Sequence, residues 1–556
     1  MKARKPILIA TLLIALSLLA WAMFPVAPAV QAEDAPPLPV PHRLFNGVVD
    51  VLTSGSSVGT PGGSSYKNPS SPICTTSSND PNVNTDCEGD APDNETSIAV
   101  NPTQPQNLIG SANDYQLRLS SGGTIVETVY SRAHVSMDGG VTWKEYPINY
   151  SNYTSTGDPA VAFDASGNAY LATLGFTWSQ NIGCCVNPDV LVATSSDGGV
   201  TWSSPSRVAS GSGSFGSVGV FNDKEYLAAW GDGNAIVTWT VFNDGIGGSY
   251  INSPIYASVT HDGGQTWSPG VEISGSAGFC EGAQGGSACD QDQASVPVVA
   301  ADGSIYVSFL NYSNDSAGRD QYLVVQVDPA TGQRVAGPYQ VGKVYDGYTD
   351  YPINIDGRQT YQDSQFRTWA AGNIAADPTD AGHLAVIWSD MRNSTLPAPS
   401  NPYEATTNSD IIVSQSFDGG ATWSNPAALK IGNDQFMPWG SYSADGLLRI
   451  GFFDRSYNRK NHAYGYTLAT EKSSGSLKFS RTKVTTALSD PTQGNRWFSG
   501  RTPNPDFPHP TTFLGDYSGM DATQGFSASL WTDLREQSCF PGRCGAGQDA
   551  YFASTP

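Results

Sequence analysis

The stretch Ser136-Met-Asp138-Gly-Gly-Val-Thr142-Trp143 places an Asp-Gly-Gly turn between strand-forming residues, and the same pattern returns three more times along the chain. The aspartates of the four copies are Asp138, Asp197, Asp262 and Asp418, so the steps between them are 59, 65 and 156 residues. In such a turn the aspartate accepts hydrogen bonds from nearby amides, and glycine supplies the positive φ angle. A turn that recurs at a regular period predicts a repeat architecture, with one degenerate copy inside the longest step.

Short apolar strands recur at a similar spacing and support the repeat. Seven segments have the pattern of innermost strands, and they begin at Glu95, Asp158, Glu225, Ser295, Gly372, Trp439 and Asp516. A closed ring of small antiparallel sheets, one per repeat, would hide the free strand edges. We therefore predict an all-β fold, a β-propeller of four-stranded blades, with seven blades favoured and six as the alternative. Residues 43–51 are expected to supply the outer strand that the last blade lacks.

The repeated turn resembles the Asp box of the sialidase-like (BNR-repeat) β-propellers, in which a Ser/Thr-x-Asp-x-Gly-x-Thr-Trp motif joins the two outer strands of a blade. The resemblance implies that the four box aspartates are structural and lie on the face away from the active site. Members of that family usually have six blades, so a seven-bladed ring would be a departure. The resemblance also implies a glycoside hydrolase that acts on terminal acidic sugars.

Composition and charge limit the possible partners. Among 556 residues, only 14% are charged and the formal net charge is −22. A chain this acidic is poorly suited to nucleic acids and to anionic membrane surfaces, so neither is expected as a partner. We expect a monomer whose partner is a glycan or a glycoprotein.

The N-terminal segment has the pattern of an export signal. Lys2, Arg4 and Lys5 precede an apolar run, and small residues then offer a cleavage site after Ala32. We predict a signal peptide over 1–32, a low-complexity segment over 33–92 with one possible ring-closing strand, and the propeller over 93–556. The alternative is an uncleaved membrane anchor. Secretion fits the eight cysteines, which form four local pairs along the chain, Cys74/Cys87, Cys184/Cys185, Cys280/Cys289 and Cys539/Cys544.

Arginines that follow second strands could bind a substrate. Arg392, Arg455 and Arg535 each stand one or two residues after an aspartate. Three converging guanidiniums could clamp a carboxylate, as the arginine triad of sialidases does, or each could be neutralised by its neighbouring aspartate. The Arg-Ile-Pro motif that carries the first family arginine is missing here.

The resemblance also suggests catalytic residues. Sialidases use a tyrosine nucleophile, a glutamate that activates it and an aspartate acid/base. The matching candidates at the starts of inner strands are Tyr517 as the nucleophile, Glu225 as its activating base and Asp158 as the acid. A tyrosine whose hydroxyl simply bonds a neighbour is the structural alternative for Tyr517.

Acidic residues near the inner-strand starts suggest calcium, because oxygen-only clusters suit this ion. The residues are Asp93, Glu95, Asp158, Asp223, Glu225, Asp292 and Asp516, with the run Asn82 to Asp86 as a local alternative. No other cofactor is expected. Two functions remain open at this point: a secreted sialidase-like glycoside hydrolase, and a non-catalytic secreted propeller that binds a glycan or a protein.

Overall fold

The computed structural model describes residues 74–86, 92–119, 125–150, 152–179, 184–214, 217–312, 314–355, 357–395, 397–493, 511, 513–523, 525–539 and 544–556. All of them belong to the compact unit Pro41–Pro556. They form strands, turns and the short 3₁₀ helices η2 (Ile246–Gly248), η3 (Arg455–Tyr457) and η4 (Pro491–Gln493). None of the described helices is long and apolar enough to cross a membrane. The predicted signal peptide lies outside the described residues.

Seven antiparallel sheets follow one another along the chain, and each forms one blade. The innermost strands, in chain order, are β3 (Asp93–Val100), β8 (Ser155–Phe163), β12 (Gly219–Trp230), β17 (Asp292–Val299), β21 (Asn373–Ala376), β25 (Gln435–Tyr442) and β29 (Gly519–Ala522). The second strands are β4 (Leu108–Leu119), β9 (Ala169–Ser179), β13 (Asn234–Asp244), β18 (Ile305–Asn311), β22 (Leu384–Asp390), β26 (Leu448–Asp454) and β30 (Ser527–Asp533). Each of the seven inner strands predicted from the sequence overlaps or directly precedes an observed innermost strand.

The outer strands complete each blade. The third strands are β6 (Ala133–Ser136), β10 (Cys184–Ser195), β15 (Ile255–Thr260), β19 (Gln321–Val327), β23 (Asp410–Ser416), β27 (Gly465–Glu471) and β33 (Asp549–Thr555). The fourth strands are β7 (Thr142–Tyr146), β11 (Ser206–Ala209), β16 (Val271–Glu272), β20 (Arg334–Lys343), β24 (Ala427–Ala428), β28 (Phe479–Lys483) and β2 (Val83–Asn84). The remaining strands are β1 (Cys74–Ser77) on β7, β5 (Ile125–Ser131) on β4, β14 (Tyr250–Asn252) on β13, and the pair β31 (Gln537–Cys539) and β32 (Cys544–Ala546).

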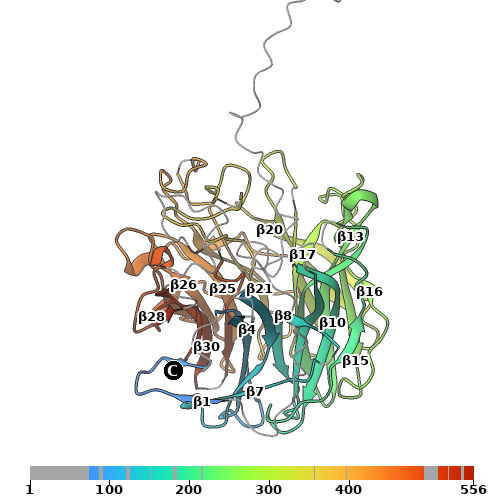
Figure 1. Ribbon diagram of the computed structural model, residues 1–556. Coiled ribbons are helices and arrows are strands. Elements are labelled where there is room, and N and C mark those ends of the chain that lie inside the picture. Colours follow the sequence, from blue (N-terminus) through green and yellow to red (C-terminus); the bar gives the residue numbers. More distant parts are fainter. Residues whose placement is uncertain are drawn as a thin grey trace, which may run out of the picture. The chain divides into compact units, whose positions relative to one another are not determined.

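The seven innermost strands close into a ring. Each contacts the next, from β3 through β8, β12, β17, β21 and β25 to β29, and β29 contacts β3. Figure 1 shows β8, β17, β21 and β25 near the centre, with outer strands such as β16 and β28 towards the rim. The prediction of seven blades is confirmed, and the six-bladed alternative is excluded.

The last blade is closed by a strand from the segment that precedes the first inner strand. The outer strand of the last blade is β2, which pairs with β33 through Val83–Phe552 and Asn84–Tyr551. Residues 43–51, which the sequence suggested for this place, lie outside the described residues. Because β2 stands only eight residues before β3, the chain passes directly from the outer edge of the last blade into the axis of the first. The segment 33–92, interpreted as low-complexity, thus supplies the closure.

Apolar side chains are buried mainly between neighbouring blades. At the junction of the last and first blades, Trp143 packs against Phe552 with ring centroids 4.9 Å apart. Gly140 must approach this pair closely, because a Cβ at its φ of 91° would lie 1.9 Å from a Phe552 ring carbon. One disulfide, Cys280–Cys289, confirms a predicted local pair.

The four Asp boxes occupy the turns between third and fourth strands, as the resemblance implied. In the third box, Asp262 accepts the Thr266 amide at 2.9 Å, the Thr266 hydroxyl at 2.5 Å and the Thr260 hydroxyl at 2.9 Å. Asp138, Asp197 and Asp418 make the same set of bonds with their own neighbours. These carboxylates hold the turn, so their structural role is explained by local hydrogen bonds.

The box carboxylate should contribute modestly to stability. Hydrogen bonds from Thr266 lower the pKa of Asp262 to about 2 from an ordinary 3.8. Its contribution is therefore present above pH 3.8 and is lost as the pH falls through 2. We expect Asp262→Ala to lower the free energy of unfolding by about 1 kcal/mol at pH 7, measured by urea denaturation. Asp232→Ala, in the exposed turn between β12 and β13, should change it by much less; equal losses would contradict the role of the box.

Candidate axial site

A repeated backbone distortion sends side chains towards the propeller axis. Five inner strands carry a β-bulge after their first two to five residues, and a residue of each bulge has a left-handed backbone. These residues and their φ angles are Glu95 (55°), Asp158 (60°), Lys224 (51°), Ala294 (57°) and Met437 (47°). Non-glycine residues adopt this conformation at a cost and cluster at functional sites. The bulge layer is therefore the first place to look for chemistry.

Lys224 lies at the centre of a buried ion-pair cluster. Its ammonium is 2.7 Å from Asp158, 3.0 Å from Asp516 and 3.2 Å from Glu95, which come from three different blades. All four side chains are at most 4% exposed. The three carboxylates raise the pKa of Lys224 well above its usual value although its burial lowers it. The lysine thus stays charged and ties the first, second, third and last blades together.

Arg367 joins this cluster from the long connection between β20 and β21. Its Nε donates to Asp516 Oδ1 at 2.9 Å, and a second nitrogen donates to Oδ2, so the pair is bidentate. The guanidinium also stacks 4.8 Å from the Phe513 ring centroid. Asp516 is buried, yet Arg367 and Lys224 lower its pKa to about 2. This carboxylate is accordingly ionised at every physiological pH.

The pKa values of two glutamates in the cluster are raised, whereas that of Asp516 is lowered. Burial raises the pKa of Glu225 well above its usual value, and the charge of Asp158 raises it further. Within the described part of the chain, neither carboxyl oxygen of Glu225 has a hydrogen-bond partner. Burial and Asp158 likewise raise the pKa of Glu95, whose Oε2 accepts from Asn113 at 2.8 Å. The axis thus holds carboxyl groups with raised pKa values beside Asp516, whose pKa is lowered.

Asp223 extends the cluster towards the fourth blade. Gln293 donates to its Oδ2 at 2.6 Å, and the Tyr312 hydroxyl donates to Gln293 at 2.6 Å. Burial raises the pKa of Asp223 to about 8, although Lys224 opposes the rise. Asp223 is therefore largely protonated at neutral pH in the folded protein.

The raised pKa of Asp223 predicts that the free energy of unfolding falls as the pH rises. A folded-state pKa above the unfolded value gives stability that is present below pH 3.8 and lost as the pH rises towards 8. Asp223→Asn removes this titration and keeps an acceptor for Gln293. We expect the free energy of unfolding of the variant, relative to the unmodified protein, to rise between pH 4 and pH 8 in urea titrations. A constant difference across this range would contradict the argument.

The structure brings the three predicted catalytic residues to one place. Asp158 and Glu225 belong to the cluster just described, and Tyr517 lies beside it, with the Lys224 ammonium 5.8 Å from its ring centroid. The Tyr517 hydroxyl makes only a long contact of 3.5 Å with the Pro159 carbonyl. Burial, and then the charges of Glu95, Asp158 and Glu225, raise the pKa of Tyr517 well above 10.0. Proximity is established, while the catalytic roles stay predictions.

The three predicted substrate-binding arginines share no partner and are already paired. Arg392 binds Asp390 at 2.6 Å, and Arg535 binds Asp533 at 2.8 Å. Arg455 is fully buried and pairs with Asp434 at 3.3 Å instead of with its sequence neighbour. Such contacts favour the structural reading of these arginines, which the sequence left open.

The predicted acidic ring is not one cluster. Asp93 lies among Asp86, Asp114, Asp549 and Glu145, and these charges, after burial, raise its pKa. Asp292 accepts from Asn311 at 2.6 Å in the fourth blade. The Oδ1 atom of Asn82 accepts from the Thr486 amide at 2.8 Å and from the Arg535 guanidinium at 2.9 Å. Among the described residues, no three His, Cys, Asp or Glu side chains are grouped so that they could hold a metal ion.

Sequence reasoning missed the two cations of the site. Lys224 stands between Asp223 and Glu225, both chosen as candidates, so its place in an acidic strand start was an available signal. Arg367 lies in a connection without any repeat, and nothing in the sequence pointed to it.

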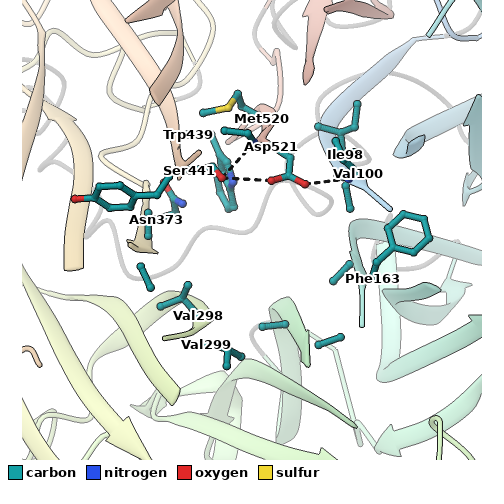
Figure 2. Close-up of a pocket in the computed structure, with 18 of the residues that line it drawn as sticks. Ile98, Val100, Phe163, Val298, Val299, Asn373, Trp439, Ser441, Met520 and Asp521 are labelled. Carbon is teal, nitrogen blue, oxygen red and sulfur yellow. Dashed lines mark hydrogen bonds between the residues drawn. The ribbon is translucent and has the colours of Figure 1, made fainter. Parts of the chain in front are cut away.

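A second feature of the axis is a cavity of about 650 Å³ below the bulge layer. It is lined by the later halves of the inner strands, and Figure 2 shows Ile98, Val100, Val298 and Val299 among its apolar walls. In three of these strands the residue two positions after the left-handed one, Tyr226, Val296 or Trp439, packs in a cluster together with Met520 and Tyr517. This packed layer stands between the ionic cluster and the cavity.

Comparison with known proteins shows only remote similarity. The sequence matches no family profile and no curated protein. Similar solved structures include a protein of unknown function from Dyadobacter fermentans, 10% identical over 85% of this chain and 97% of that chain, with a TM-score of 0.42. The Hadza microbial sialidase Hz136 is 11% identical over 78% of this chain and 73% of that chain, with a TM-score of 0.41. The GH93 α-L-arabinofuranosidase of Fusarium graminearum is 14% identical over 66% of this chain and 90% of that chain, with a TM-score of 0.39. The chain is thus similar in structure to sialidases and arabinofuranosidases at low identity, and similarities this weak carry no conclusion about its activity.

Proposed function

We propose that the protein is a secreted glycoside hydrolase whose reaction takes place at the axial cluster. The observation that carries the proposal is the pair Asp158 and Glu225. Asp158 is paired with the Lys224 ammonium at 2.7 Å, and Glu225 is buried, has a raised pKa and has no hydrogen-bond partner in the described chain. Glycoside hydrolysis requires one carboxyl group that can give up a proton and a second carboxyl group beside it.

The proposal assigns roles that differ from those predicted by resemblance. Glu225 donates its proton to the leaving glycosidic oxygen as the C–O bond breaks. Asp158 stabilises the positive charge that develops at the anomeric carbon, and water then adds there and returns a proton to Glu225. Tyr517, whose raised pKa disfavours the phenolate, borders the pair without acting as the nucleophile.

The charge of the cluster bears on the substrate. Lys224 is matched by three carboxylates, and Arg367 by Asp516. No cation of the described cluster is left to bind the carboxylate of an acidic sugar. This balance supports a neutral glycan as substrate over the terminal acidic sugar that the resemblance implied.

The test is turnover of a panel of chromogenic glycosides that contains an α-sialoside and neutral pyranosides and furanosides. We expect the purified protein to hydrolyse a neutral member and Asp158→Asn to lose at least 100-fold in kcat/KM, as for loss of a charge that stabilises the transition state. Asp232→Asn is the charge-matched control and should keep full activity. Hydrolysis of the sialoside alone would overturn the assignment of the substrate, and equal activity in Asp158→Asn would overturn the site.

A second candidate is a non-catalytic propeller that binds a glycan or a protein. The pairing of Arg392 and Arg535 with their neighbouring aspartates favours it, and so does the complete burial of Glu95 and Asp158. In this case the folded protein turns over no glycoside but is retained on a glycan array or by a protein partner.

A further inference from the structure

The cavity below the packed aromatic layer has the composition of a ligand site. Its volume of about 650 Å³ lies within the roughly 300–1,000 Å³ typical of sites for small molecules. Its walls come from the inner strands of all seven blades and are mostly apolar, with residues such as Val161, Leu227 and Ile374. A hollow of this size and polarity favours a ligand with an apolar body.

One carboxylate stands in these apolar walls. Asp521, half-buried on β29, accepts the Val100 amide at 2.9 Å on Oδ2 and the Ser441 hydroxyl at 3.3 Å on Oδ1, as drawn in Figure 2. Among the described residues that line the cavity, none is Lys, Arg or His. Each carboxylate oxygen can accept two bonds, so both oxygens have capacity for a further donor. A wholly apolar ligand would displace water from the Asp521 carboxylate and supply no counter-ion. Removing water from an unpaired charge costs free energy.

Aromatic rings lie at the inner end of the same cavity. Trp439 and Tyr226 both line it, with their ring centroids 4.9 Å apart. Aromatic faces attract cations through the ring quadrupole, and tryptophan does so most strongly. Figure 2 shows Trp439 and Asp521 on the same side of the cavity. An ammonium group there would meet a carboxylate and an aromatic face together.

From these contacts we propose that the axial cavity binds a small organic cation that carries an apolar body. The ammonium group pairs with Asp521 and with the aromatic end, and the apolar body occupies the space between the aliphatic walls. The proposal does not depend on the hydrolase reaction, because the packed layer of Tyr226, Val296 and Trp439 stands between the two sites.

The test uses three probes of nearly equal size and different charge. They are 2-phenylethylammonium, 2-phenylethanol and 3-phenylpropanoate, and their binding is measured by isothermal titration calorimetry. We expect the ammonium to bind at least tenfold more tightly than the alcohol, in line with a charge-assisted hydrogen bond, and the carboxylate not to bind. Equal binding of the ammonium and the alcohol, or no binding of either, would overturn the proposal.

Two variants separate the contributions. In Asp521→Asn the preference for the ammonium over the alcohol should vanish, whereas Asp302→Asn, which removes the same charge from an exposed turn, should keep it. Ala162→Phe fills the cavity from β8 without touching the carboxylate and should abolish binding of both probes. This second variant keeps the test decisive if Asp521→Asn does not fold. Retention of the preference in Asp521→Asn, or of binding in Ala162→Phe, would place the ligand elsewhere.

Discussion

Replacing Lys224 with methionine is expected to lower the free energy of unfolding by about 3–5 kcal/mol at pH 7, the range found when one partner of a buried ion pair is removed. The side chain is 4% exposed and stands within 3.2 Å of three carboxylates. Methionine fills a similar volume but leaves Glu95 and Asp158 without the ammonium, while Asp516 keeps Arg367 alone. Urea denaturation followed by tryptophan fluorescence measures the loss.

The pH dependence of that loss identifies its cause. Without the ammonium, the folded state of the variant binds protons more readily at the carboxyl groups that faced Lys224, so their pKa values rise there. Groups of this kind stabilise the fold at low pH and cease to do so as the pH rises. The difference between Lys224→Met and the unmodified protein should therefore shrink from pH 7 to pH 4. Lys472→Met, at an exposed position, is the control, and a loss below 1 kcal/mol at pH 7 would refute the central role of Lys224.

The second large effect concerns the proposed reaction. Glu225→Gln should lower kcat by about 10²–10⁴, the usual contribution of a general acid. Glutamine has nearly the same shape as a neutral glutamic acid, so the free energy of unfolding should not fall at neutral pH. A raised pKa disfavours folding as the pH rises, and the variant should be the more stable form in alkaline solution.

Measuring both kcat and the free energy of unfolding of Glu225→Gln distinguishes a catalytic role of Glu225 from a structural one. A merely structural glutamate would show a loss of stability and no selective loss of kcat. Glu281→Gln, which alters an exposed glutamate, should change neither quantity. The pH profile adds a further readout, because the rate should fall as the pH rises through the pKa of Glu225. Unchanged kcat in Glu225→Gln would remove the general acid from the proposal.

The propeller was predictable because its signals are local. An Asp box such as that of Asp262 is closed by hydrogen bonds within seven residues, and Gly140 is required by its own φ angle. The inner strands carry their own apolar pattern, so their number followed from the sequence. The ring-closing strand did not, since any short segment before β3 could pair with β33, and only the packed ring selects Val83–Asn84.

The candidate site shows the same division between local and distant contacts. Acidic residues at strand starts, among them Asp158 and Glu225, were visible in the sequence. Their partners were not, because Lys224 reaches Asp516 across 292 positions and Arg367 reaches it across 149. Likewise, the sequence left both substrate binding and local pairing open for the arginines beside Asp390 and Asp533, and their contacts show the local pairing.

The sequence by itself determined the blade repeat, the Asp boxes and the acidic character of the axial strand starts, because each depends on residues that are neighbours along the chain. The tertiary structure alone decided which strand closes the ring, which carboxyl groups share Lys224, and that a cavity with one carboxylate lies below the aromatic layer. The physical reason is that the axis is built from one short segment of every blade. Which side chains meet there depends on the bulges and on the closure of the whole ring, and neither is encoded in any single repeat.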